Sequence, residues 1–382
     1  MNFEFSEDQA LLKNQAETVL RDLATTETLR SFLDAPASHD RALWAKMAEL
    51  GWLGVAIPEE LGGAGLGPLE LCVLAEEVGR SLAPVPFGST LYLTAEAIAA
   101  CADKAVRAVF LPKIAAGDAI GAAAFSEGAG RREALASASL PAVQWRAGRL
   151  SGVKTPVQDL PAADIAVVSA AADGEPALFL VDLGADGVVK ERLRTIDDTR
   201  PSGRLVLNDA PAIRLTEPGD GAAAIDRLLD RAAVYTAFEQ IGAADRCVFA
   251  ARDYALERRA FGRPIGAFQA IKHRLADMYV TVELARSNAY FGAWALSGDA
   301  GALPVAAAAA RLSASEAFSF CAAENVHIHG GVGFTWEYDC HLFYRRAKLL
   351  ALCLGGPLYW RERLMRRLTR DAAQASTAAA AA

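Results

Sequence analysis

The spacing of apolar residues predicts helices over the first third of the chain. From Ser6 onward apolar residues recur at helical intervals, and Ser6 with Gln9 has the form of a capping box at a helix start. Residues 69–78 and 91–98 predict two further helices, and a loop rich in Gly and Pro precedes them at residues 58–68. We therefore expect a helical N-terminal module.

Between about Ile120 and Arg214 the pattern changes to short runs of β-prone residues. The runs cover residues 165–168, 178–181 and 205–207, and Gly, Pro and Asp separate them. Short runs divided by turn residues are typical of antiparallel strands. This part of the chain predicts a small β domain.

Helical spacing returns after the linker-like segment 216–221. One stripe of apolar residues follows intervals of four and three and predicts the seam of a helical bundle. Its members are Ile271, Leu275, Met278, Val282, Ala285 and Ala289. From about Asp371 the chain is rich in alanine, and such low complexity does not require an ordered structure.

These patterns together predict a mainly α protein with a central β module. The expected domains are an N-terminal helical domain at 1–118, a middle antiparallel β domain at 119–221, a C-terminal helical bundle at 222–370 and a flexible Ala-rich tail at 371–382.

Composition and charge narrow the class of protein. The 382 residues carry a formal net charge of -7, which argues against a nucleic-acid partner because phosphate binding needs clustered Lys and Arg. No apolar run approaches the roughly 18 residues of a membrane helix. The acidic start lacks the basic and then apolar pattern of an export signal, so we expect a cytoplasmic protein. The six cysteines include no C-x-x-C pair, so neither a zinc ribbon nor a disulfide framework is predicted.

Two local patterns invite a ligand but favour structural explanations. The run Gly62 to Gly67 fits neither the G-x-G-x-x-G nor the P-loop spacing and follows no predicted strand, so a tight turn is favoured. His327 and His329 lie two residues apart, which on a helix directs their side chains to different sides. We expect no metal site there.

A third pattern, at residues 254–269, carries chemistry suited to a nucleotide. Arg258 can clamp a pyrophosphate, Phe261 can lie against a flat heterocycle, and Gln269 offers a donor and an acceptor to an adenine or ribose edge. An ordinary turn between helices, with solvated arginines, explains the same residues.

A fourth pattern follows at Gly330, Gly331 and Gly333. Closely spaced glycines leave backbone amides approachable by an anion. A glycine-rich helix stop is the alternative.

Taken in order, the motifs of this chain resemble those of the acyl-CoA dehydrogenase family. The C-terminal signature is similar at Arg258-x-x-Phe261-Gly262 to Phe268-Gln269, at 329–334 and at 345–348. Upstream, the resemblance continues at 51–54, 58–63, 111–117 and 125–130, so that it spans the chain from the first helix to about Leu368. The family's layout of helices, β domain and four-helix bundle agrees with the pattern above.

The resemblance implies an FAD-dependent dehydrogenation of an acyl-CoA thioester. Arg258, Phe261 and Gln269 would reach across a subunit interface to the adenine and pyrophosphate end of a neighbour's FAD. The segment from His327 to Gly333 would contribute to the same region, with Gly330 and Gly331 beside the cofactor. At His327 the family usually has Gln. Phe125 and Ser126, in another motif, would also contact the cofactor. Such a shared site implies a dimer or tetramer. The family also implies an electron-transfer flavoprotein as the electron acceptor.

The chain departs from the family where the catalytic base is expected. The reaction needs a carboxylate beside the substrate α-carbon. Leu354 occupies one family position for this Glu, and Ala232 occupies the other. Glu239 follows Ala232 by two helical turns, about 10 Å along the axis, and is a weak substitute. No catalytic residue is therefore identified.

The lining of the flavin ring also departs from the family. Lys154 to Gln158 replaces the usual Trp-x-Thr or Trp-x-Ser after a lysine, and Arg131-Arg132 replaces the usual Ser-Asp. One explanation is a heteromeric enzyme in which a sister chain supplies the base. The alternatives are an active homomeric dehydrogenase with an unplaced base, and a flavin-free binding or scaffold protein of the same fold.

Overall fold

The chain forms two compact units in the computed structural model, which describes residues 6–35, 37–128 and 140–381. The first, the bundle unit, combines residues 75–82 with 233–382 and the described part of 1–10. The second, the mixed unit, holds residues 11–74 and 83–232. The units interleave along the chain, so the three-domain division by sequence order stays a prediction.

The N-terminal part is helical, as its apolar spacing predicts. Ser6 and Gln9 form the reciprocal capping box: the Ser6 amide donates to Gln9 Oε1 at 3.0 Å, and the Gln9 amide donates to Ser6 Oγ at 3.2 Å. The helices are α1 (Glu7–Leu23), α2 (Thr26–Asp34), α3 (Arg41–Glu49), α4 (Pro68–Arg80), α5 (Glu96–Ala99) and α6 (Lys104–Ala115), with the π-helical η3 (Gly88–Ala95) leading into α5 and the short turns η1 (Trp52–Gly54) and η2 (Glu59–Leu61) before α4.

The glycine-rich run between η2 and α4 serves packing. A Cβ on Gly63 would stand 2.0 Å from the carbonyl oxygen of Ile57, so only glycine permits this backbone contact. The contact supports the structural explanation of the run.

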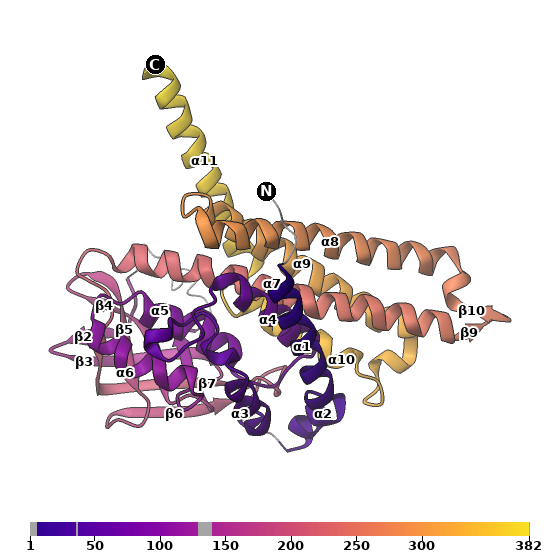
Figure 1. The fold of residues 1–382 in the computed structure, drawn as a ribbon, viewed down its shortest axis with the longest axis horizontal. Helices are drawn as coiled ribbons and strands as arrows, with labels where there is room; N and C mark the ends of the chain where they lie inside the picture. The colour runs from indigo at the N-terminus through magenta and orange to yellow at the C-terminus, as the bar shows by residue number, and fades with distance from the viewer. Residues whose placement is uncertain (1–5, 36, 129–139, 382) are drawn as a thin grey trace. The chain divides into compact units, whose positions relative to one another are not determined.

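The mixed unit contains an eight-stranded sheet (Figure 1). Its strands are β1 (Gly121–Ala124), β2 (Gln144–Arg146), β3 (Arg149–Gln158), β4 (Ile165–Ala172), β5 (Glu175–Asp182), β6 (Val188–Leu193), β7 (Ser202–Pro211) and β8 (Ile213–Arg214). Their order is β6-β7-β3-β2-β4-β5-β8, with β1 paired to β4. Most pairs are antiparallel, but β1 and β2 each run parallel to β4, whose eight residues are all buried.

The bundle unit contains the long C-terminal helices. They are α7 (Gly221–Glu257, from Ala233 in this unit), α8 (Gln269–Gly298), α9 (Leu303–His329), α10 (Cys340–Leu352) and α11 (Pro357–Ala381), with a small ribbon of β9 (Arg259–Ala260) and β10 (Arg263–Pro264) and the turns η5 (Ile265–Ala267) and η6 (Gly330–Phe334). Helices α8 and α9 run side by side (Figure 1).

Helix α8 carries the apolar stripe that the sequence predicts. Met278, Val282, Ala285 and Ala289 are buried, while Ile271 and Leu275 nearer its start are half-buried. The mainly α architecture with a central β module is thus confirmed. The helix α11 runs through Ala381, and flexibility of the Ala-rich tail stays a prediction.

None of the helices in the described ranges is both long enough and apolar enough to cross a membrane.

Candidate functional site

The turn between α7 and α8 presents the residues with nucleotide-like chemistry to solvent. Phe261 is 95% exposed and has a φ of 52°, and Gly262 follows it at 80°, which together make the tight end of the β9–β10 ribbon. Arg258 and Gln269 are also exposed. Figure 1 shows this ribbon projecting beyond the adjoining ends of α7 and α8.

The same turn holds an arginine over the face of an aromatic ring. The guanidinium of Arg263 lies 4.1 Å from the centre of the Phe268 ring, and the Phe261 ring meets Phe268 edge-on at 6.1 Å. The sequence alone did not single out Arg263. Its position between Gly262 and Pro264, inside the same short motif, was the available signal.

The end of α9 lies beside the end of α7. The ring of His329 stacks on Tyr254 at 4.1 Å and meets Tyr338 edge-on at 5.6 Å. Burial lowers the pKa of His329, whose Nδ1 lies 2.8 Å from the carbonyl oxygen of Asn325. The structure therefore brings the 254–269 motif and the glycine-rich motif together at one end of the bundle unit.

His327, two residues earlier, points away from this contact. Its side chain is 82% exposed, and its Nδ1 lies 3.7 Å from Glu324, which also pairs with Arg274 at 3.2 Å. The exposed His327 and the buried His329 diverge as expected for an interval of two on a helix. Among the residues that the structure describes, no group of three or more His, Cys, Asp or Glu side chains is arranged to hold a metal.

The two residues directly after α9 have open space where a side chain would stand. A Cβ built on Gly330 or on Gly331 would meet no atom within 4 Å, whereas one on Gly333 would strike the carbonyl oxygen of Val326 at 2.5 Å. The first two glycines thus leave the backbone accessible, and the third is needed for packing.

The predicted base positions hold buried apolar side chains. Ala232 is 0% exposed in the mixed unit, and Leu354 is 3% exposed in the bundle unit. Neither side chain can accept a proton. Glu239 is 1% exposed, so its carboxylate belongs to the interior of the bundle unit.

A buried arginine anchors the turn that leads to Leu354. The guanidinium of Arg311 donates to Gln240 Oε1, to Ser315 Oγ and to the carbonyl oxygen of Leu350, and it lies 3.8 Å from Cys353 Sγ. Burial lowers the pKa of Arg311 from its usual value. A buried hydrogen-bond network therefore fixes the turn that comes directly before Leu354, one of the two predicted base positions.

Phe125 and Ser126 lie at the end of β1, in a set of hydrogen bonds centred on Lys154. The Lys154 ammonium is fully buried and donates to the Phe125 carbonyl at 3.2 Å, to Glu127 at 2.8 Å and to Ser169 at 3.0 Å. Burial by itself would raise the pKa of Glu127. The hydrogen bonds from Lys154 and from nearby backbone amides have the larger effect, so the pKa of Glu127 is lowered. The carbonyl of Ser126 accepts from the Thr155 amide at 2.8 Å.

These residues differ in how they fit an FAD. The exposed Arg258, Phe261 and Gln269 suit a pyrophosphate and an adenine ring, and they are free of the bundle core. Lys154, by contrast, is occupied by Glu127 inside the sheet. Arg131 and Arg132, in the segment that departs from the family, lie outside the described residues.

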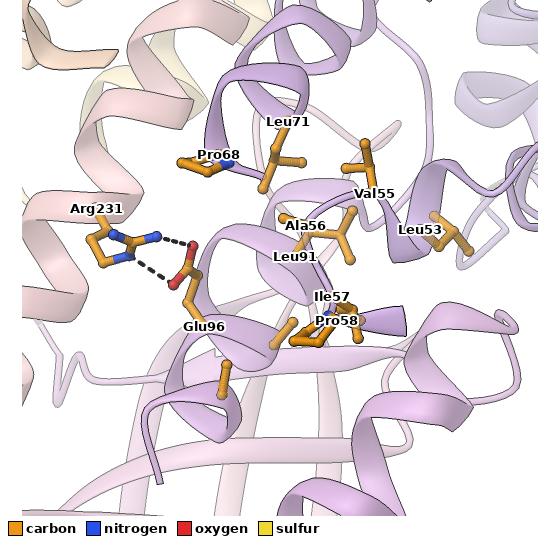
Figure 2. A pocket seen from close by; sticks show the side chains of 12 residues that line it. Leu53, Val55, Ala56, Ile57, Pro58, Pro68, Leu71, Leu91, Glu96 and Arg231 are labelled. Atoms are coloured by element: carbon orange, nitrogen blue, oxygen red, sulfur yellow. Dashed lines mark hydrogen bonds and ion pairs between the residues drawn. The ribbon is translucent and has the colours of Figure 1, made fainter. Parts of the chain in front are cut away.

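The mixed unit also contains a hollow of about 200 Å³ that sequence analysis missed. Its lining comes from four separated stretches of chain: Leu53 to Pro58, Pro68 with Leu71, Leu91 to Ala99, and Arg231 of α7. Figure 2 shows Val55, Leu71 and Leu91 on one side and the Arg231–Glu96 pair at the other. No local sequence pattern predicts this hollow, because the apolar residues of each stretch are those expected in any protein core.

Comparison with known proteins identifies the fold's relatives. The acyl-CoA dehydrogenase N-terminal domain model matches residues 6–118, and the acyl-CoA dehydrogenase C-terminal domain model matches residues 219–373. The chain is similar to the acyl-CoA dehydrogenase IpdE2 of Mycobacterium tuberculosis, with 33% identity over 96% of this chain and 97% of that protein.

Two solved structures are similar over almost the whole length. A variant of the Tcur3481-Tcur3483 steroid ACAD has 35% identity and a TM-score of 0.87, covering 96% of this chain and 99% of its own. A chain of the ChsE4-ChsE5 complex from Mycobacterium tuberculosis has 31% identity and a TM-score of 0.88, covering 97% and 99%. By its motifs, its fold and its relatives, this chain belongs to the acyl-CoA dehydrogenase family.

Proposed function

We propose that this chain is the subunit of a heteromeric, FAD-dependent acyl-CoA dehydrogenase that lacks the catalytic base. The observation that carries the proposal is the replacement of both family base positions by the buried apolar residues Ala232 and Leu354. Abstraction of the substrate α-proton requires a positioned carboxylate, and neither position offers one. A sister chain then supplies the base and the flavin-ring pocket.

The chain's own contribution is to hold the cofactor's adenine end. In this proposal Arg258 binds the pyrophosphate, Phe261 lies against the adenine and Gln269 hydrogen-bonds its edge, in a site completed by the neighbouring subunit. His327, Gly330 and Gly331 border the same region, and the space beside the two glycines supports an approach by the cofactor. Bound FAD supplies the hydride acceptor.

Phe125 and Ser126 are proposed as a second, separate contact with the flavin. Their backbone carbonyls are already used by Lys154 and Thr155, so a contact would come from their remaining groups. Glu239 is not needed as a base, and its burial suits a structural carboxylate.

The relatives support a heteromer and a bulky acyl-CoA. The two similar structures named above are described as a steroid ACAD of two named components and as a ChsE4-ChsE5 complex. We infer a dimeric or tetrameric assembly with a second dehydrogenase-like chain, an acyl-CoA ester as substrate and an electron-transfer flavoprotein as acceptor.

A visible absorption spectrum tests this proposal. The chain is purified alone and after co-expression with a candidate sister chain, and each sample is titrated with acyl-CoA esters. We expect a colourless protein alone and a yellow complex that substrate bleaches. One FAD per chain in the isolated protein, with bleaching, would establish the homomeric enzyme instead. Absence of flavin from both samples would favour a scaffold protein.

A further inference from the structure

The apolar hollow of the mixed unit continues into a second, more polar hollow of about 470 Å³. Both are lined by Glu96, Ala99 and Arg231, so they meet at this point. Arg231 and Glu96 face one another in a two-bond pair, with Nε to Oε2 at 2.8 Å and Nη2 to Oε1 at 2.9 Å (Figure 2). The opposite charges of Arg231 and Glu96 offset one another, and the pair forms a polar part of the lining where the two hollows meet.

The apolar hollow has the size and lining of a hydrocarbon site. Apart from the ion pair its lining is entirely apolar, and it includes Val55, Ile57, Leu71 and Leu91, all 5% exposed or less. Its volume exceeds that of the engineered apolar cavity of about 150 Å³ that holds a benzene molecule. A single ring or a medium-length alkyl chain therefore fits.

The polar hollow contains a guanidinium, that of Arg227, which can bind an anion. Arg227 lies one helical turn before Arg231 on α7, so both side chains border the same hollow. Arg227 pairs with Asp220 at 2.7 Å, but the two side chains are 60% and 46% exposed. Such exposed pairs contribute little stability, so an incoming anion can replace Asp220 at small cost. Glu217, the remaining carboxylate on this rim, is exposed and solvated.

The geometry points to a binding site for a free carboxylate with a medium-length apolar tail. The tail occupies the apolar hollow, passes beside the Arg231–Glu96 pair, and the carboxylate binds Arg227. This site uses none of the residues assigned above to FAD or to the base positions, so it stands independently of the proposed function.

Calorimetric titration of the full chain tests the site. Octanoate should bind saturably, and both butyrate, with a shorter tail, and octanol, with no charge, should bind at least tenfold more weakly. Absence of saturable octanoate binding would overturn the proposal. Equal binding of octanol would overturn the role of Arg227.

Two variants locate the ligand. Ala95→Leu fills the apolar hollow and should weaken octanoate binding at least tenfold, and Arg227→Gln should reduce octanoate to the affinity of octanol. Ala56→Leu, from another wall of the same hollow, replaces Ala95→Leu if that variant does not fold.

Matched controls lie elsewhere in the mixed unit. Ala108→Leu on α6 enlarges an exposed alanine, and Arg204→Gln removes an arginine from an exposed pair with Glu191 at 2.9 Å. Both should bind octanoate as the unmodified chain does. Unchanged binding in Ala95→Leu and Ala56→Leu would show that the hollow is not the site.

Discussion

The backbone of Gly79 in α4 lies directly against the carbonyl of Glu239 in α7, where a Cβ on residue 79 would come within 1.8 Å of the oxygen. Gly242 repeats this contact in the other direction, because its Cβ would meet the carbonyl oxygen of Glu76 at 1.8 Å. The two helices therefore cross inside the bundle unit with glycine on each side. Such an approach is open only to a residue without a side chain.

Substituting Gly79 with alanine should destabilise the bundle unit. The added methyl group cannot be relieved by rotating a side chain, since it meets backbone, and overpacking of this kind costs about 1–3 kcal/mol or more. Urea unfolding measures the change in the free energy of unfolding. Gly298→Ala, in the last turn of α8 with no atom within 4 Å, is the control and should be neutral or slightly stabilising. Equal stabilities for the two variants would contradict the close crossing.

A buried ion pair in the mixed unit gives a second prediction. Arg200 binds Asp159 through Nε at 2.8 Å and Nη2 at 2.6 Å, with both side chains 2% exposed. Asp159→Asn should lower the free energy of unfolding by about 3–5 kcal/mol, because it leaves the guanidinium buried without its counter-charge. Glu191→Gln, which breaks an exposed pair with Arg204, should change it by about 0.5 kcal/mol or less. Chemical denaturation measures the free energy of unfolding of both variants. Similar losses in the two would show that burial does not make the Arg200–Asp159 pair more important than the exposed pair.

Protonation of His329 should destabilise the bundle unit. Burial holds its pKa below the ordinary value of 6.5 in the folded chain, so the unfolded chain takes up the proton first as the pH falls. The stability that the neutral His329 ring contributes is fully present above pH 6.5, the ordinary pKa of histidine. It is lost as the pH falls from there through the lower pKa of the folded chain. Unfolding measured at about pH 7.5 and about pH 5.5 should show a smaller loss in His329→Gln than in the unmodified chain.

A second histidine, which is half-buried, should contribute to the same pH dependence of stability. His39, in the mixed unit, also has a lowered pKa, through burial first and then the charge of Arg41. The remaining loss in His329→Gln should therefore shrink further when His39 is replaced as well. A pH dependence identical in all three proteins would rule out both rings as its source.

The proposed contact of Phe261 with the adenine of FAD predicts a loss of cofactor without a loss of stability. Phe261 is 95% exposed, so Phe261→Ala should leave the melting temperature of the isolated chain unchanged. In the complex with a sister chain it should weaken FAD retention about two- to tenfold, since an aromatic contact contributes about 0.5–1.5 kcal/mol. Flavin absorbance after gel filtration measures retention. Leu66→Ala, which removes a 60% exposed apolar side chain of the mixed unit, should retain FAD, and equal loss in both variants would refute the contact.

Local elements and the chemistry of single positions can be predicted from the order of residues alone. Helical spacing along 271–289 predicts the buried face of α8, and the Ser6–Gln9 pair predicts the start of α1, because each signal involves neighbouring residues whose geometry the backbone fixes. The sequence also shows without coordinates that Leu354 and Ala232, the two predicted base positions, cannot accept a proton, because their side chains are alkyl groups.

The contacts between distant residues become visible only in the folded chain. It pairs β1 and β2 in parallel with β4, stacks His329 on Tyr254, and sets Gly79 against Glu239. It also assembles the hollow beside Arg231 from widely separated stretches of chain, none of which carries a distinguishing motif. Contacts of this kind depend on how the intervening chain packs, and local apolar periodicity contains no information about the partner that a buried face will find.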